Sequence, residues 1–163
     1  MPLVRLKLTW SLALLALPLG AQSAAPASTI SADLLRYPLS GKALHMLQGA
    51  IETSEAGNHA AAIEQLQKTL VKFPDTGAYV YSLLGVEDLK TGQIPDAVHA
   101  LEQAVTLLPH DASNHANLGL ALACKGQYDR AESELKRALD LDAHNKIAAQ
   151  LLKTLAVGSN AQK

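Results

Sequence analysis

Apolar side chains recur every three or four residues from about residue 42 onward, with polar side chains between them. This spacing places the apolar positions on one face of a helix. We therefore predict helices over residues 42–53 and 59–71, two further helix pairs between residues 78 and 144, and a last helix over 145–156. The pattern predicts an all-α protein.

The segment 81–104 is followed thirty-four residues later by a similar segment, 115–138. A fixed period of this size indicates that each unit is one supersecondary element, which buries its apolar face only by stacking on its neighbour. The matching pairs are Gly85 and Gly119, Gly92 and Gly126, Ala97 and Ala131, Leu101 and Leu135, and Ala104 and Ala138.

Gly85 and Gly119 lie inside helical patterns, where glycine costs about 1 kcal/mol relative to alanine. Close approach of a second helix is the expected reason, because glycine has no Cβ. We predict that Ala97 and Ala131 face these glycines, with the leucines one turn further along the same stripe.

Gly92 and Gly126 stand between the two helices of each unit, where a left-handed residue is expected to end the first helix. Pro95 then falls in the first turn of the next helix, where its missing N–H is harmless. Asp96 and Asp129 lie near the positive ends of the second helices. Each unit is therefore predicted to be a helix-turn-helix.

This pattern resembles the tetratricopeptide repeat (TPR), whose signature has an aromatic residue, Leu-Gly, alanine, a second aromatic and a closing proline. The second aromatic is leucine in both units, the helix A tyrosine is Asp88 or Leu122, and the last proline is Ala143. A helical bundle of another kind is the alternative. The matching residues are Tyr81, Leu84, Gly85, Ala97, Leu101 and Pro109, then His115, Leu118, Gly119, Ala131 and Leu135.

The resemblance implies a right-handed α-solenoid over residues 41–157, with repeats at about 43–76, 78–111 and 112–144. The first repeat is the weakest copy, with Met46 and Ala50 at the Tyr81 and Gly85 positions. Its offset to the next repeat is thirty-five residues, so we expect one extra residue near 75–77. Residues 145–157 would form a capping helix with Ile147, Leu151, Leu152 and Leu155 inward, and 158–163 a frayed tail.

The N-terminus has the pattern of a signal peptide. Arg5 and Lys7 precede an apolar run over residues 8–19, and small residues follow at 21–23. The run is shorter than the roughly 20 residues that a membrane-spanning helix needs. We predict a signal peptide over 1–23, with cleavage before Ala24 and a retained anchor as the alternative, and a flexible spacer over 24–40.

Charge argues against nucleic acid as a partner. The chain has fourteen basic and fifteen acidic residues, and two of the basic ones lie in the predicted signal, so the mature net charge is near −3. The signs are interspersed and form no basic face. Cys124 is the single cysteine and has no partner for an intramolecular disulfide. It is either a small apolar residue or a thiol that meets another chain.

No set of residues has the spacing of a catalytic or metal site, so we expect no enzyme activity, cofactor or bound metal. The six histidines form no close pair on one helix face, and His115 takes the aromatic core position of its repeat, where we expect a buried or half-buried ring. The alternative is a metal-binding or enzymatic protein that uses the scattered histidines. Those histidines are His45, His59, His99, His110, His115 and His144.

The resemblance implies an interaction scaffold that binds a protein or peptide in the groove lined by the first helices. With the predicted signal, it would be periplasmic or secreted and free of the membrane after cleavage. The implied groove is mostly apolar, which favours an apolar partner segment, although Val86 and Leu120 could instead pack between repeats. The implied groove residues are Leu47, Ile51, Tyr79, Ser82, Val86, Leu89, Ser113, Ala116, Asn117, Leu120 and Ala123.

Overall fold

The computed structural model describes residues 39–160, and these form seven α-helices, one short 3₁₀ turn and no strand. The predicted signal peptide and nearly all of the predicted spacer lie outside these residues. The elements are α1 (Gly41–Glu55), α2 (His59–Lys72), the 3₁₀ turn η4 (Pro74–Thr76), α3 (Gly77–Thr91), α4 (Ile94–Leu107), α5 (Ala112–Cys124), α6 (Tyr128–Leu141) and α7 (Lys146–Asn160).

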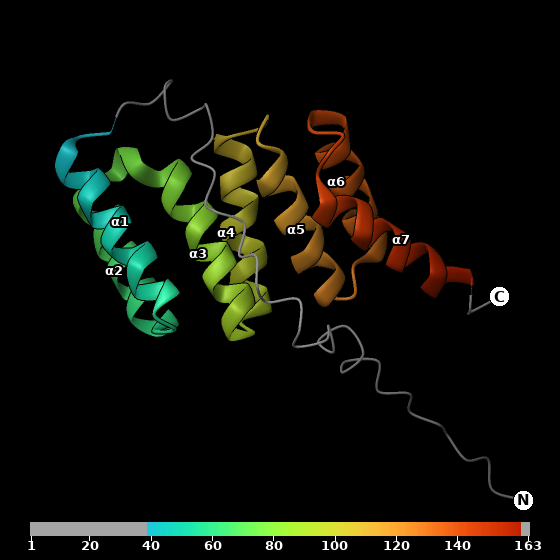
Figure 1. Cartoon of the computed structure of the whole chain (residues 1–163), viewed down its shortest axis with the longest axis horizontal. Coiled ribbons are helices and arrows are strands. Elements are labelled where there is room, and N and C mark those ends of the chain that lie inside the picture. Colours follow the sequence, from blue (N-terminus) through green and yellow to red (C-terminus); the bar gives the residue numbers. More distant parts are fainter. Residues whose placement is uncertain (1–38, 161–163) are drawn as a thin grey trace, which may run out of the picture. The chain divides into compact units, whose positions relative to one another are not determined.

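Each helix packs against the next in chain order, so the helical array from α1 to α7 is a row of antiparallel pairs (Figure 1). In addition, α3 contacts α5 and α5 contacts α7. The first helices of successive pairs therefore adjoin one another and form one side of the array, which we call the inner face. The all-α solenoid that the sequence predicted is confirmed.

The turns inside the repeats follow the predicted glycine chemistry. Gly92, the C-cap of α3, has φ 77°, and Gly126, after α5, has φ 81°. Both lie in the left-handed region that glycine adopts without steric cost. Pro95 stands in the first turn of α4, and Asp96 and Asp129 lie in the first turns of α4 and α6, as expected.

Close approach of the second helix explains the glycines inside α3 and α5, and leucine side chains are the nearest groups to both. A Cβ atom at Gly85 would lie 2.4 Å from Leu101 Cγ, and one at Gly119 would lie 2.6 Å from Leu135 Cγ. The three atoms nearest to the Cβ position at Gly85 all belong to the Leu101 side chain. A Cβ at Gly119 would also lie 3.2 Å from the backbone oxygen of Ala131, which is farther away than the nearest Leu135 atoms.

The region of the predicted extra residue, 75–77, contains the end of the 3₁₀ turn η4 and the first residue of α3. At the other end, α7 continues to Asn160 and so includes part of the segment predicted as a tail. Its buried residue is Ala148, with Leu151, Leu152 and Leu155 partly buried, whereas Ile147 is 43% exposed. The inward orientation predicted for Ile147 was wrong, because the buried side of α7 is centred one residue later.

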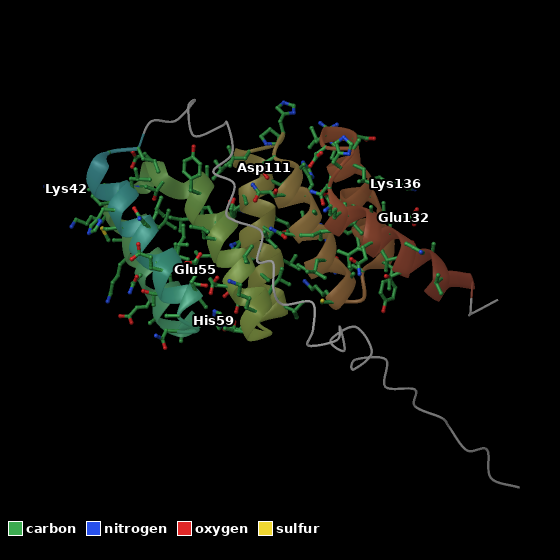
Figure 2. All side chains as sticks on the ribbon, in the orientation of Figure 1. Lys42, Glu55, His59, Asp111, Glu132 and Lys136 are labelled. Atoms are coloured by element: carbon green, nitrogen blue, oxygen red, sulfur yellow. The ribbon has the colours of Figure 1, made fainter. Side chains whose placement is uncertain are left out.

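Side-chain caps fix where three helices begin. Ser40 accepts a hydrogen bond from the Ala43 N–H, Asp111 from Asn114, and Asn145 from Ala148. Figure 2 shows Asp111 in the loop before α5. Such caps satisfy an N–H that the helix itself cannot, and each contributes about 1 kcal/mol. The Asn145 cap begins α7, which packs against α6.

Candidate functional site

Three of the predicted groove residues are core residues. Leu47 is buried with Leu66 and Val80, and Ala116 is buried with Leu135 beneath α7. Ala123 is buried in the cluster that joins α4, α5 and α6. Leu47, Ala116 and Ala123 therefore cannot meet a partner while the array is folded, and the structure removes them from the predicted groove.

Two further predicted residues are partly used by the core. Tyr79 packs against the cluster that contains Leu66, and Leu89 packs against the cluster that contains Leu122. Ser82 is half-buried, and its hydroxyl donates a 2.9 Å hydrogen bond to the Ala78 carbonyl of the same helix. Tyr79, Leu89 and Ser82 are therefore less available to contact a partner than the sequence suggested.

The remaining residues leave a short apolar strip on the first helices. Ile51, Val86 and Leu120 occupy equivalent positions of α1, α3 and α5, and each is half-buried. We call these three residues the inner strip. Asn117 is half-buried and Ser113 is exposed on α5. Val86 and Leu120 belong to none of the three core clusters, which argues against the alternative that they merely pack between repeats.

A buried carboxylate joins α1, α2 and α3. Glu87 is 4% exposed, and it accepts hydrogen bonds from Ser54 at 2.7 Å and Lys90 at 2.8 Å, while His59 Nδ1 lies 2.8 Å from its other oxygen. Burial alone would raise the pKa of Glu87, but hydrogen bonds from Lys90, Ser54 and His59 hold it below its usual value. Figure 2 labels His59 near the chain reversal between α1 and α2. This network is structural.

His115 is also held within the fold. The ring is 6% exposed, with Nδ1 2.7 Å from Glu134 Oε2 and Nε2 3.1 Å from the Pro109 carbonyl. Both ring nitrogens have partners, as the repeat position predicted. The described residues contain no group of three or more His, Cys, Asp or Glu side chains placed to hold a metal ion.

A cavity of about 230 Å³ lies between α2, α3 and α4. None of the predicted groove residues lines it. Asp88 lies in this cavity and is only 7% exposed, yet no hydrogen bond to its carboxylate is found among the described residues. Burial, followed by the charges of Asp96 and Glu87, raises the pKa of Asp88 from its ordinary value of 3.8 to about 6. The lining residues are Ile63, Gln67, Tyr81, Leu84, Asp88, Gln93, Asp96, His99 and Ala100.

Sequence reasoning noted Asp88 but did not identify it as part of a site. Glu87 and Asp88 are neighbours on α3 but point in different directions, since Glu87 bonds to α1 and α2 while Asp88 lines the cavity. The signal was present in the repeat itself. The equivalent of Asp88 in the next unit is Leu122, which is fully buried in the core. An acid in a core position marks a place where packing is interrupted.

Cys124 is the last residue of α5 and is exposed. Partial burial of its thiol raises the pKa of Cys124 above the usual value.

None of the described helices combines the length and hydropathy that crossing a bilayer requires. The candidate surfaces are therefore the inner strip and the Asp88 cavity.

Comparisons with known proteins agree with the repeat pattern. Residues 83–146 match the family model described as "Tetratricopeptide repeat". Heat shock protein STI1 of Saccharomyces cerevisiae is 31% identical over 109 residues, which make up 67% of this chain and 15% of that protein. The chain thus spans a small part of the length of this relative.

Solved structures share the fold. The first TPR of Spaghetti (RPAP3), bound to an HSP90 peptide, superposes with a TM-score of 0.70 at 18% identity, covering 76% of this chain and 98% of that one. MamA from Desulfovibrio magneticus RS-1 gives 0.68 at 25% identity, covering 72% and 66%. The Sgt2 TPR domain from Aspergillus fumigatus gives 0.69 at 15% identity, covering 74% and 81%. The family match covers residues 83–146, and these structures share the fold of the helical array.

Proposed function

We propose that this chain is a non-catalytic interaction scaffold that is exported from the cytoplasm and binds a segment of a partner protein along the inner strip. The observation that carries this proposal is the position of Val86 and Leu120. Both are apolar, half-buried and outside the core clusters, and they recur at equivalent positions of adjoining helices. Such a row suits apolar side chains of an extended or helical segment.

The chemistry of the strip favours an apolar partner over an acidic one. The RPAP3 structures contain HSP90 and HSP70 peptides that end in Glu-Glu-Val-Asp. An acidic terminus calls for Lys or Arg on the binding face. None of the eleven predicted groove positions holds either residue, and Asn117 is the only amide there. Binding should therefore show a negative heat-capacity change and little dependence on salt.

The test uses Val86→Arg combined with Leu120→Arg in affinity capture from a cell-envelope extract. The double variant should lose a partner that the parent retains, because two charges would interrupt the apolar contact. Val71→Arg is the matched control, since Val71 is 84% exposed on α2, away from the first helices. The partner is then purified and titrated by calorimetry. Equal capture by all three proteins would refute binding at the inner strip.

Circular dichroism separates loss of binding from loss of folding. The double variant should keep the helical signal, and its melting midpoint should stay within a few degrees of the parent, about 0.5 kcal/mol per site. A large fall in the midpoint would mean that Val86 and Leu120 act in the core instead.

Export has its own test. The basic residues Arg5 and Lys7, the apolar run and the small residues at 21–23 support it. Full-length protein expressed in a bacterial host should appear in the periplasm or medium with an N-terminus at Ala24. Protein that keeps residues 1–23 in the cytoplasm would contradict this part of the proposal.

A further inference from the structure

At the Asp88 cavity, the second repeat lacks the buried leucine that the third repeat contains. In the third repeat the fully buried Leu122 occupies the position equivalent to Asp88. Leucine there packs into the core, whereas Asp88 lines the cavity of about 230 Å³. The second repeat therefore has both free volume and a carboxylate where its neighbour has packed apolar atoms.

The same comparison shows a missing cation. In the third repeat Arg130 donates to Gln127 at 2.7 Å and to Glu102 at 2.8 Å. The equivalent positions of the second repeat are Gln93 and Gln67, with Asp96 in place of the arginine. The cavity thus keeps one amide acceptor, has an amide in place of the Glu102 carboxylate, and has a carboxylate in place of the Arg130 guanidinium.

Nothing in the described part of the chain compensates Asp88. The residues that line the cavity include His99 but no Lys or Arg, and Asp88 as a residue is 7% exposed with no hydrogen bond to its carboxylate found among the described residues. The nearest lysine along α3, Lys90, is held by Glu87 and Ser54. A buried carboxylate without a partner is costly, so the site is prepared for a donor that comes from outside.

We propose that the Asp88 cavity binds a basic side chain of a partner protein, with the cationic head between Asp88 and Asp96 and the aliphatic stem against Ile63, Leu84 and Ala100. Lysine and arginine have this division into an apolar stem and a charged head. The lining has the same division, with three apolar side chains beside two carboxylates. A protein partner is favoured over a free cation because the apolar lining contributes only if a stem accompanies the charge.

This surface is separate from the inner strip. The cavity is lined by α2 and α4 together with the side of α3 that faces them, and it includes no residue of the strip. Val86→Arg with Leu120→Arg should therefore leave cavity binding unchanged. Failure of one proposal is thus distinguishable from failure of the other.

The test titrates isotope-labelled protein with the peptide acetyl-Gly-Arg-Gly-amide at low salt and follows amide signals around the cavity by NMR. The same peptide with citrulline, which has the shape of arginine without its charge, is the ligand control. We expect saturable shifts with the arginine peptide. The citrulline peptide should bind at least about tenfold more weakly. Asp88→Asn should weaken arginine binding about tenfold, whereas Asp129→Asn, in the first turn of α6, should change it less than about twofold.

Three results would overturn the proposal. The first is absence of saturable shifts up to about 50 mM peptide. The second is equal binding of the arginine and citrulline peptides, or equal binding by parent and Asp88→Asn. The third is binding of ethylguanidinium as tightly as the peptide, which would mean a free-cation site rather than a site for a partner's side chain. Asp88→Leu supplies a folded check, because it restores the residue type of the third repeat and should abolish binding.

Discussion

Gly85 and Gly49 are both helix-interior glycines, but their surroundings differ. A Cβ at Gly85 would meet Leu101 Cγ at 2.4 Å, whereas nothing lies within 4 Å of one at Gly49. Alanine gains about 1 kcal/mol over glycine from helix propensity alone. We therefore expect Gly49→Ala to stabilise the protein by up to about 1 kcal/mol, and Gly85→Ala to destabilise it by about 1–3 kcal/mol through overpacking.

Urea unfolding of both variants measures this difference. Gly119→Leu should be worse than Gly85→Ala, because its larger side chain meets Leu135 and the Ala131 backbone. If Gly85→Ala and Gly49→Ala raise the urea midpoint equally, close helix approach is not what selects glycine in α3.

Asp88 predicts a specific dependence of stability on pH. Because the folded protein holds its pKa at about 6, above the ordinary value of 3.8, the folded state binds more protons between these two values. Stability from this group is therefore fully present below about pH 4 and is lost as the pH rises through about 6. The charges of Asp96 on α4 and Glu87 on α3 contribute to the raised pKa of Asp88, and His99 on α4 lines the same cavity.

Asp88→Asn removes this loss and leaves the side-chain size nearly unchanged. The free energy of unfolding of the variant, relative to the parent, should rise between pH 4 and pH 6 and stay level above about pH 7. Urea midpoints at four pH values provide the measurement. Glu87, whose lowered pKa acts in the opposite direction at lower pH, is common to both proteins and largely cancels. A constant difference across the range would contradict the prediction.

At the scale of residues, the sequence predicted turn and buried-ring positions well and groove positions poorly. Gly92, Gly126 and His115 have local chemistry that admits few alternatives. Leu47 and Ala116 failed because the apolar stripe of a helix is wider than the face that a partner can reach. Periodicity gives the stripe but not the angle at which a neighbouring helix covers it.

At the scale of elements, α7 packs on α5 and α6, as the predicted capping role requires, and its buried side gives a sharp test of that role. Ala148 is fully buried and Ala149 is exposed. Ala148→Glu should cost about 3 kcal/mol because it forces a charge against α5 and α6. Ala149→Glu should stay within about 0.5 kcal/mol of the parent. Equal midpoints in thermal denaturation would show that α7 is not docked there.

Truncation before Asn145 extends this test to the whole element. Removing α7 uncovers Ala116, Leu135 and Ala138, which form one buried cluster with Ala148. A contiguous apolar face on a soluble protein favours association. The shortened chain should bind a hydrophobic dye or self-associate in ultracentrifugation. A monomer as stable as the parent would exclude a capping role.

Helix positions were predictable because each helix has its own periodicity and boundary residues. The start of α7 at Lys146 follows from Asn145, and the end of α3 from Gly92. Surface pairs such as Glu132 and Lys136, one turn apart on α6 (Figure 2), add little because both are half-exposed or more. The register of the array comes instead from the glycine–leucine contacts and the buried Glu87 network.

At the scale of the whole helical array, the cavity could not have been predicted from periodicity. It requires residues of α2, α3 and α4 that are up to thirty-seven positions apart, from Ile63 to Ala100. The repeat alignment does show that Asp88 stands where Leu122 stands in the next unit. Its meaning emerges only when the three helices are placed together and the carboxylate is found without a donor.

The contact of α7 with both α5 and α6 also determines how long a partner segment must be to reach α7. Since α7 meets its two predecessors as α5 meets α3 and α4, it serves as the first helix of an incomplete fourth repeat. Thr154 then continues the row of Val86 and Leu120, thirty-four residues after the latter. Adjoining helix axes lie roughly 10 Å apart, and an extended chain advances roughly 3.3 Å per residue. A segment that reaches from Val86 to Thr154 therefore needs about six residues. A shorter segment that starts at Val86 would not contact α7.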